Sequence, residues 1–147
     1  MKITYKGDYA LKALLDLALH YDGSTVVSMH QLAKRLDIPN KFLEQVLLEL
    51  KRGGFVASRR GKIGGYLLAK LPSRIKVGDV VRFMDGSIEP ISCVAQRYKG
   101  CSDIYRCVFR KIWQDVASAI TGIVDNITFE DLVRKMNRRK GTFVYEI

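Results

Sequence analysis

The chain has 147 residues, of which 48% are hydrophobic, enough for one domain with a buried core and an appended helical part. Its 25 Lys and Arg outnumber 15 Asp and Glu, and the formal charge of +10 favours a polyanion such as nucleic acid over an acidic or neutral partner. No run of about 18 apolar residues is present, and the start of the chain lacks the apolar segment and cleavage site of a secretion signal, so we expect a cytoplasmic protein that does not cross a membrane.

The first predicted element is an amphipathic helix over residues 8–21. Apolar side chains recur along it at the spacing that places them on one buried face of a helix. These residues are Ala10, Leu11, Leu14, Leu15, Ala18 and Leu19. We therefore expect this helix to lie in the core.

Two shorter helices, joined by the sequence DIPN, are predicted next. Ser28 and Gln31 have the spacing of a capping box, in which each side chain satisfies an unpaired backbone N–H at the helix start. Pro39 suits the first turn of the second helix, where its missing N–H has no cost, and Gly53 with Gly54 marks the end of that helix. Two short helices joined by a tight turn are typical of a helix-turn-helix motif.

A β-hairpin is predicted after the second helix, with strands over residues 55–58 and 66–69 and a basic, glycine-rich tip. Residues 51–70 contain six basic side chains and no acidic one. A run of charge is often only a solvated face. Because this run follows directly on a helix-turn-helix pattern, we interpret the hairpin as a wing whose charge is neutralised by DNA phosphates.

The segment over residues 72–90 has both alternating and helical apolar spacing. We expect Val77, Val80, Val81 and Phe83 to pack beneath the DNA-binding part. A structural role is therefore predicted for this segment.

All three cysteines of the chain lie in one loop, at Cys93, Cys101 and Cys107. In a reducing cytoplasm, an odd number of thiols favours metal binding or redox sensing over a disulfide framework. The seven and five intervening residues differ from the short pairs of a zinc site and suit an open loop around an iron–sulfur cluster. Three ordinary structural thiols are the simpler alternative.

The neighbours of the cysteines favour an anionic cluster. Both histidines, His20 and His30, are far in the sequence from the loop. Basic side chains near the cysteines would stabilise thiolates. They are Arg97, Lys99, Arg106 and Arg110.

A long amphipathic helix is predicted over residues 107–123, about 25 Å long at the rise of an α-helix. We expect its apolar stripe to be buried against a second copy, since a helix-turn-helix protein reads two half-sites as a dimer. After it, Thr128 and Asp131 have the spacing of a further helix start. No role is assigned to the tail over residues 137–147. The apolar stripe of the helix over residues 107–123 comprises Val108, Ile112, Trp113, Val116, Ala119, Ile120 and Ile123.

Several blocks of the sequence carry a family resemblance over nearly the whole chain. They are KGDYALKALLDLAL, FLEQVLLELKRGGFVASRRGKIGGYLLAK, VGDVVRFMDG and the three-cysteine loop ahead of a tryptophan-bearing helix. In this order they resemble the bacterial winged-helix regulators that include IscR, the regulator of iron–sulfur cluster assembly, NsrR, the nitric-oxide sensor, and CymR, the cysteine-metabolism repressor.

The resemblance implies a homodimer that carries an iron–sulfur cluster on Cys93, Cys101 and Cys107, with a 2Fe-2S cluster preferred over a 4Fe-4S cluster. In the IscR branch the fourth ligand is a histidine three residues after the last cysteine. Here that position is Arg110, which has no lone pair to give. The NsrR branch uses an aspartate near the N-terminus that reaches across the dimer, and its position matches Asp8.

The identity of the fourth ligand stays open between three alternatives. Asp8 is a ligand, or Asp8 only caps the first helix. In the third alternative the ligand is Asp103, a small thiol or water. A ligand other than cysteine would leave the cluster open to nitric oxide, oxygen or loss, which suits a sensor.

The resemblance also implies residues that read an operator in double-stranded DNA. Lys41 and Glu44, at the start of the second helix of the motif, would contact bases in the major groove, and Arg60 on the wing would enter the minor groove. Candidate phosphate contacts set the register without specifying the sequence. They are Tyr5, Lys6, Lys34, Arg35, Arg59 and Lys62.

We therefore predict a mainly α fold with a small β wing, formed by a winged helix-turn-helix domain and a long dimerisation helix. The predicted parts are residues 1–85 for DNA binding, 86–107 for the cluster loop, and 108–147 for the dimerisation helix and the C-terminal helix and tail. The predicted function is a transcriptional regulator that senses iron–sulfur status, redox state or nitric oxide. The alternatives are a repressor without a cluster, controlled by thiol oxidation or a partner protein, and more remotely an electron carrier or enzyme.

Overall fold

The first helix begins earlier than the apolar spacing indicated. In the computed structural model, which describes residues 1–144, helix α1 spans Tyr5–Leu19. Thr4 is its N-cap, because the Thr4 hydroxyl accepts a hydrogen bond from the Gly7 N–H (3.1 Å). Thr4 in turn contacts Asp85, whose carboxylate accepts hydrogen bonds from the Thr4 N–H (3.0 Å) and hydroxyl (2.5 Å). The start of α1 is thereby tied to a helix some eighty residues later.

The helix-turn-helix is formed by α2 (Met29–Leu36) and α3 (Asn40–Arg52). The predicted capping box is present, with Gln31 N–H donating to the Ser28 hydroxyl (3.1 Å) and Ser28 N–H donating to the Gln31 side chain (3.0 Å). Pro39 is the N-cap of α3 and Gly53 its C-cap, so the predicted ends of this helix are also confirmed.

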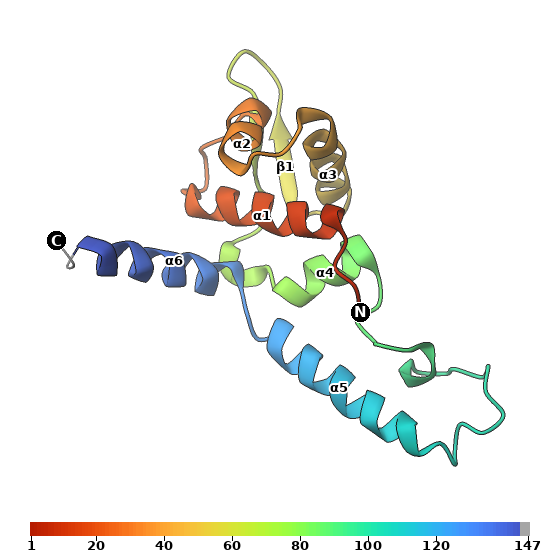
Figure 1. Ribbon diagram of the computed structural model, residues 1–147. Helices are drawn as coiled ribbons and strands as arrows, with labels where there is room; N and C mark the ends of the chain where they lie inside the picture. The colour runs from red at the N-terminus through yellow and green to blue at the C-terminus, as the bar shows by residue number, and fades with distance from the viewer. Residues whose placement is uncertain (145–147) are drawn as a thin grey trace.

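The wing is an antiparallel pair of strands, β1 (Val56–Arg59) and β2 (Gly65–Leu68), in a register that pairs Arg59 with Gly65. Tyr66 also exchanges backbone hydrogen bonds of 2.8 Å in both directions with Val27, just before α2. The base of the hairpin is therefore fixed to the helix-turn-helix, while its tip projects beyond it (Figure 1).

The remaining elements are two single turns of 3₁₀ helix, η1 (Pro72–Arg74) and η2 (Ser92–Val94), and three α-helices. Helix α4 (Val77–Asp85) packs against α1. The loop and α5 (Val108–Val124) extend away from the winged-helix body, and α6 (Phe129–Val144) returns to lie along α1 (Figure 1). The predicted start of α6 is confirmed, since Asp131 N–H donates to the Thr128 hydroxyl (3.2 Å).

One hydrophobic core joins α1 through α4, the wing and the start of α6. Phe83 packs against Phe55 of the DNA-binding part as expected, although its side chain stays 44% exposed. One residue differs from the expectation. Phe129 is fully buried in this core, although it falls in the C-terminal part that was expected to lie outside the DNA-binding domain.

Within the described residues the architecture is six α-helices and a two-stranded sheet, which confirms the predicted mainly α fold with a small wing. The tail without an assigned role is helical up to Val144, and residues 145–147 lie outside the described part. Among the helices described, none combines the length and the apolar character needed to cross a membrane.

Candidate nucleic-acid interface and cysteine loop

Helix α3 presents one polar face to solvent. Lys41 and Glu44 are both exposed on it, while the opposite face lies in the core. The spacing of the buried residues explains this orientation, since they recur every three or four positions. They are Leu43, Val46, Leu47 and Leu50.

Two exposed residues beside Lys41 and Glu44 were not among the candidates. Phe42 is 56% exposed, and Gln45 is exposed one turn after Lys41. A glutamine can make two hydrogen bonds to adenine in the major groove. The signal that could have identified Gln45 is its spacing of four residues from Lys41, which places both on one face of the helix.

The wing adds exposed cations at the same end of the molecule. Arg59, Arg60 and Lys62 are all exposed. The Arg59 guanidinium donates a hydrogen bond to the Ser24 carbonyl (3.1 Å), which holds the stem of the wing against the turn after α1. Arg60 and Lys62 lie beyond the last strand pair, at the tip.

The two candidate phosphate contacts in the first helix, Tyr5 and Lys6, differ in their surroundings. Tyr5 is 82% exposed. The Lys6 ammonium forms an ion pair with Glu49 (3.0 Å), so Lys6 also connects α1 to α3. An exposed pair of this kind contributes little to stability, so the charge stays accessible to a phosphate.

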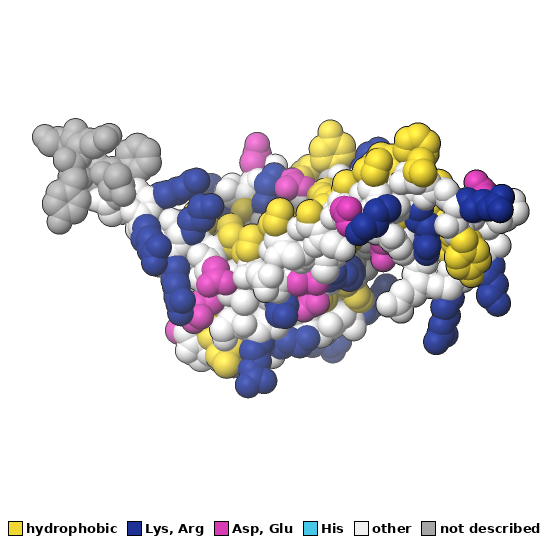
Figure 2. All heavy atoms as spheres, turned by 90° about the horizontal axis from the view of Figure 1, so that it is seen from below, with side chains coloured by type: hydrophobic (Ala, Val, Ile, Leu, Met, Phe, Trp, Pro, Cys, Tyr) yellow, Lys and Arg dark blue, Asp and Glu magenta, His cyan; other side chains and the backbone are white. Residues whose placement is uncertain are grey.

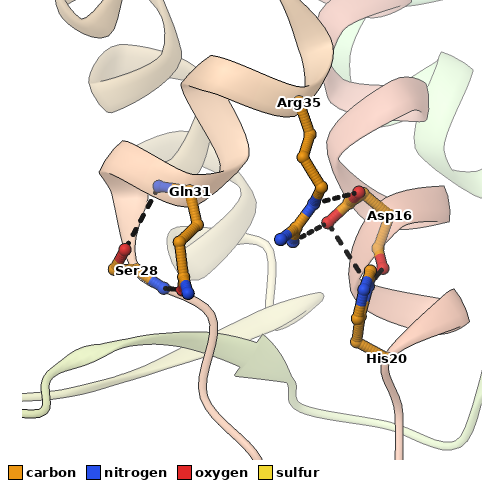
Figure 3. Close-up of polar contacts among 5 residues, drawn as sticks. All are labelled: Asp16, His20, Ser28, Gln31 and Arg35. Atoms are coloured by element: carbon orange, nitrogen blue, oxygen red, sulfur yellow. Dashed lines mark hydrogen bonds and ion pairs between the residues drawn. The ribbon is translucent and has the colours of Figure 1, made fainter.

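Lys34 and Arg35 are neighbours in α2 with different environments. Lys34 is exposed, whereas the Arg35 guanidinium donates two hydrogen bonds to the Asp16 carboxylate (2.9 and 2.6 Å) (Figure 3). Asp16 is only 7% exposed, and His20 Nδ1 lies 3.6 Å from the same carboxylate. The hydrogen bonds to Asp16 raise the pKa of Arg35 above its ordinary value. Arg35 therefore joins α2 to α1.

We expect Arg35→Ala and Lys34→Ala to differ in kind. Removing Arg35 leaves the buried Asp16 carboxylate without its main partner, which should lower the free energy of unfolding by about 2 kcal/mol, less than for a fully buried pair. Removing Lys34 should leave stability within about 0.5 kcal/mol and should reduce the salt dependence of DNA binding by about one counterion per subunit. Denaturant unfolding measures the first effect, and a salt series of DNA binding measures the second. If Arg35→Ala reduces the salt dependence and leaves stability unchanged, Arg35 is the phosphate contact.

The cysteine loop places its three thiols in different settings. Cys93 lies in η2 and Cys107 is the N-cap of α5, both half-buried, and Cys101 is exposed between them. All three are free thiols. Among the residues that the structure describes, no three His, Cys, Asp or Glu side chains converge into a group that could hold a metal ion.

Arg110 connects the two ends of this loop. Its Nε–H donates a hydrogen bond to the Cys93 carbonyl (3.0 Å), so the first turn of α5 is fixed to η2. The side chain at the position of the IscR-type histidine thus makes a structural contact, consistent with a guanidinium that has no lone pair to give.

Asp8 lies in the first turn of α1 but is not its cap, since Thr4 fills that place. The alternative in which Asp8 serves only as the helix cap is therefore wrong. Its carboxylate forms an ion pair with Lys12 one turn later (2.6 Å), which raises the pKa of Lys12. The Asp8 side chain is 43% exposed and lines a surface hollow with the residues before α1.

Helix α5 has no buried residue in the single chain. Figure 2 shows hydrophobic side chains gathered over this helix, with basic side chains at both ends of the view. Among the exposed large side chains of the apolar stripe, the exposed fraction runs from 37% at Val116 to 74% at Val108. Phe109, at 61%, adds to this surface.

An ion pair between Arg82 and Asp125 anchors the end of α5 to the winged-helix body. Arg82 donates two hydrogen bonds to Asp125 (2.7 and 2.9 Å), which lowers the pKa of Asp125. Gly78 makes this approach possible, because a Cβ at that position would lie 1.9 Å from the Asp125 carboxylate. Helix α5 is therefore connected to α4 at one end and to the cysteine loop at the other.

These features define the class. A helix-turn-helix with an exposed polar face on α3, followed by a basic wing, is the architecture of a winged-helix DNA-binding protein. The profile of the Rrf2 family, described as an iron-dependent transcriptional regulator, matches residues 3–135. The chain belongs to the Rrf2 family of DNA-binding transcriptional regulators.

Named relatives agree with this assignment. The chain is 38% identical to an rrf2-like HTH-type transcriptional regulator of Rhodobacter capsulatus, covering 92% of this chain and 94% of the relative. It is 39% identical to the HTH-type transcriptional regulator IscR of Serratia proteamaculans, covering 93% and 82%. These relatives are named as regulators of transcription.

Solved structures are similar over the same length. The structure of CymR, the global cysteine regulator of B. subtilis, has a TM-score of 0.77 and 30% identity, covering 92% of this chain and 98% of that one. T. potens IscR has a TM-score of 0.73 and 33% identity, covering 92% and 88%. The predicted resemblance to the IscR and CymR group is thereby confirmed.

Proposed function

We propose that this chain is a cytoplasmic, homodimeric regulator that binds an operator in double-stranded DNA and senses iron–sulfur status, redox state or nitric oxide. An iron–sulfur cluster on Cys93, Cys101 and Cys107 is the sensing group. The observation that carries the proposal is the position of three free thiols on the loop that leads directly into α5.

The exposed stripe of α5 supports the dimer. A helix of 17 residues with no buried side chain would leave its apolar face in water. Pairing with the same helix of a second copy buries both stripes around a two-fold axis. The two α3 helices of such a dimer would face two half-sites of one operator.

The donor set fits an iron–sulfur cluster. Thiolates are the usual ligands of such clusters, and all three thiols are free, with Cys101 exposed and Cys93 and Cys107 partly exposed. When bound, the cluster supplies a group that gains or loses electrons or reacts with nitric oxide. The chain contributes the three thiols, the contact of Arg110 with the Cys93 carbonyl, and an anchored helix that connects the loop to α4. A 2Fe-2S cluster is our preferred form.

Asp8 is the proposed fourth ligand, supplied by the partner protomer. Its carboxylate is partly exposed and forms a surface ion pair with Lys12. Because such a pair contributes little to stability, breaking it to bind iron would cost little free energy. We expect Asp8→Ala to change the absorbance spectrum of the cluster or to increase its rate of loss, with helical content unchanged. Spectra of anaerobically reconstituted wild type and variant measure this, with Lys12→Ala as the control for loss of the ion pair. Identical spectra and lability in the wild type and Asp8→Ala would place the fourth ligand elsewhere.

Base reading is assigned to Lys41 and Glu44 on α3 and to Arg60 on the wing, with Gln45 added from the exposed face of α3. Lysine donates to guanine, glutamate accepts from the cytosine amino group, and arginine suits the narrow minor groove of A·T-rich DNA. Their exposure on α3 and on the wing that packs beside it supports this assignment. Phosphate contacts are assigned to Tyr5, Lys6, Lys34, Arg59 and Lys62, and Arg35 is left out because it pairs with Asp16.

Arg60→Ala and Lys62→Ala should weaken DNA binding in different ways. Arg60→Ala should cost about 1–3 kcal/mol on a selected operator and less on scrambled DNA, because a groove contact carries sequence information. Lys62→Ala should weaken both duplexes equally and reduce the salt slope by about one per subunit. Binding of the wild type and both variants over a salt series tests this, and equal losses for Arg60→Ala on both duplexes would reduce the wing to a phosphate clamp.

A second candidate is a regulator without a cluster, whose thiols are oxidised directly or which responds to a partner protein. It is favoured by the finding that the three thiols are not gathered into a ligand group in the described chain, and by the exposure of Cys101. Absorbance of protein purified without oxygen separates the two candidates, since only the cluster form is coloured.

A further inference from the structure

The tip of the wing carries an apolar side chain where a polar one is usual. Ile63 is 88% exposed, the largest value for any aliphatic residue among the exposed large hydrophobic side chains of the described chain. Turn positions normally hold glycine, proline or short polar residues. A single exposed apolar residue is not unusual by itself, so its exact setting decides what it does.

The setting is a tight turn. The Gly64 N–H donates to the Gly61 carbonyl (3.0 Å), which makes Lys62 and Ile63 the two central residues of a four-residue turn. Gly61 has a φ of +120°, and a Cβ on Gly64 would lie 2.7 Å from the Arg59 carbonyl. The turn is therefore held close to the strand ends, and its two central side chains are both exposed.

The charge around Ile63 indicates what covers it. Arg60 and Lys62 are exposed beside it, and no acidic side chain occurs between residues 51 and 70. An apolar protein surface would offer these cations no opposite charge, and a second copy of this positively charged tip would repel them. The minor groove of DNA offers both complements, since its phosphates attract the cations and its deoxyribose walls accept an apolar side chain.

We propose that Ile63 inserts into the minor groove beside Arg60 and is a specificity-determining contact of the wing. This inference rests on the proposed DNA-reading role of the wing and adds an apolar contact to it. Buried there, Ile63 favours A·T pairs, because the amino group of guanine fills the floor of the minor groove at G·C pairs.

The experiment uses a duplex selected from a random pool by the full-length wild-type protein. Ile63→Ala should raise Kd about tenfold, which corresponds to about 1.4 kcal/mol, with an unchanged salt slope because no charge is removed. Ile63→Val should stay within about threefold of the wild type, since most of the apolar surface is kept. Leu71→Ala, an aliphatic residue 49% exposed outside the wing, is the matched control and should have no effect.

The groove is identified by base substitution under the wing. Inosine–cytosine pairs present an A·T-like minor groove and a G·C-like major groove, so the penalty of Ile63→Ala should persist when they replace A·T pairs. With G·C pairs the wild type should lose affinity, and the penalty of the variant should shrink.

An unchanged Kd for Ile63→Ala, or a penalty that disappears with inosine–cytosine pairs, would overturn the proposal. A changed oligomeric state of Ile63→Ala would assign the residue to a contact between copies and overturn it equally. If the wild type selects no duplex from the pool, the proposed DNA-reading function fails first, so the two failures are distinguishable.

Discussion

Cys101→Ser is expected to yield a colourless protein that retains the fold of the wild type. Cys101 is exposed in the loop before α5, so the substitution should change the free energy of unfolding by less than about 0.5 kcal/mol. A serine hydroxyl is not deprotonated at neutral pH as readily as a thiol and is a poor ligand for iron in such clusters. Iron and inorganic sulfide per protein should therefore fall close to background after anaerobic reconstitution, whereas the wild type binds both.

The neighbouring Ser102 provides a matched control. Ser102 is exposed in the same loop and has no sulfur, so Ser102→Ala should leave the colour, iron and sulfide of the reconstituted protein as in the wild type. Colourless, iron-free wild-type protein would contradict the cluster and favour direct thiol oxidation. Retention of the cluster in Cys101→Ser would remove Cys101 from the ligand set.

Phe129→Ala should be among the most destabilising single substitutions in the chain. Phe129 is fully buried at the start of α6, in the same core as α1 and α4. Truncating a buried phenylalanine removes its transfer free energy and leaves a cavity, for a loss of about 3–5 kcal/mol. For a domain of this size the melting temperature should fall by roughly 10 °C.

Tyr105→Ala is the control for this experiment, because Tyr105 is an aromatic residue that is 95% exposed. Its substitution should leave the free energy of unfolding within about 0.5 kcal/mol of the wild type. Denaturant unfolding at several protein concentrations separates the stability of the fold from any contribution of the dimer. A loss below about 1 kcal/mol for Phe129→Ala would show that α6 does not depend on the core.

Local signals in the sequence were sufficient for most elements of the fold. The capping box of Ser28 and Gln31, the Thr128 cap and the glycines after α3 act within four residues, so their effect can be read from spacing alone. The same is true of the buried face of α3, which follows from helical periodicity. The positions of the wing strands were displaced by only one residue, because strand ends depend on pairing as well as on composition.

Contacts between distant segments could not be predicted in this way. Thr4 rather than Asp8 caps α1, and Thr4 is also held by Asp85, 81 residues later in the chain. Phe129 enters the core because the chain turns back after α5, a path that apolar spacing does not specify. Phe83 packs against Phe55 as its spacing predicted, but the sequence did not show that the side chain would stay 44% exposed.

At the candidate site, Lys34 and Arg35 also show the difference between what residue type predicts and what the packing of distant segments decides. The sequence by itself determined a basic helix-turn-helix and wing, and a loop of three thiols ahead of a long apolar stripe, because these depend on residue type and short spacing. Only the tertiary structure decided that Arg35 joins two helices through Asp16 while Lys34 stays free for solvent. The physical reason is that an ion pair depends on how two helices pack, and adjacent residues on one helix point to different neighbours.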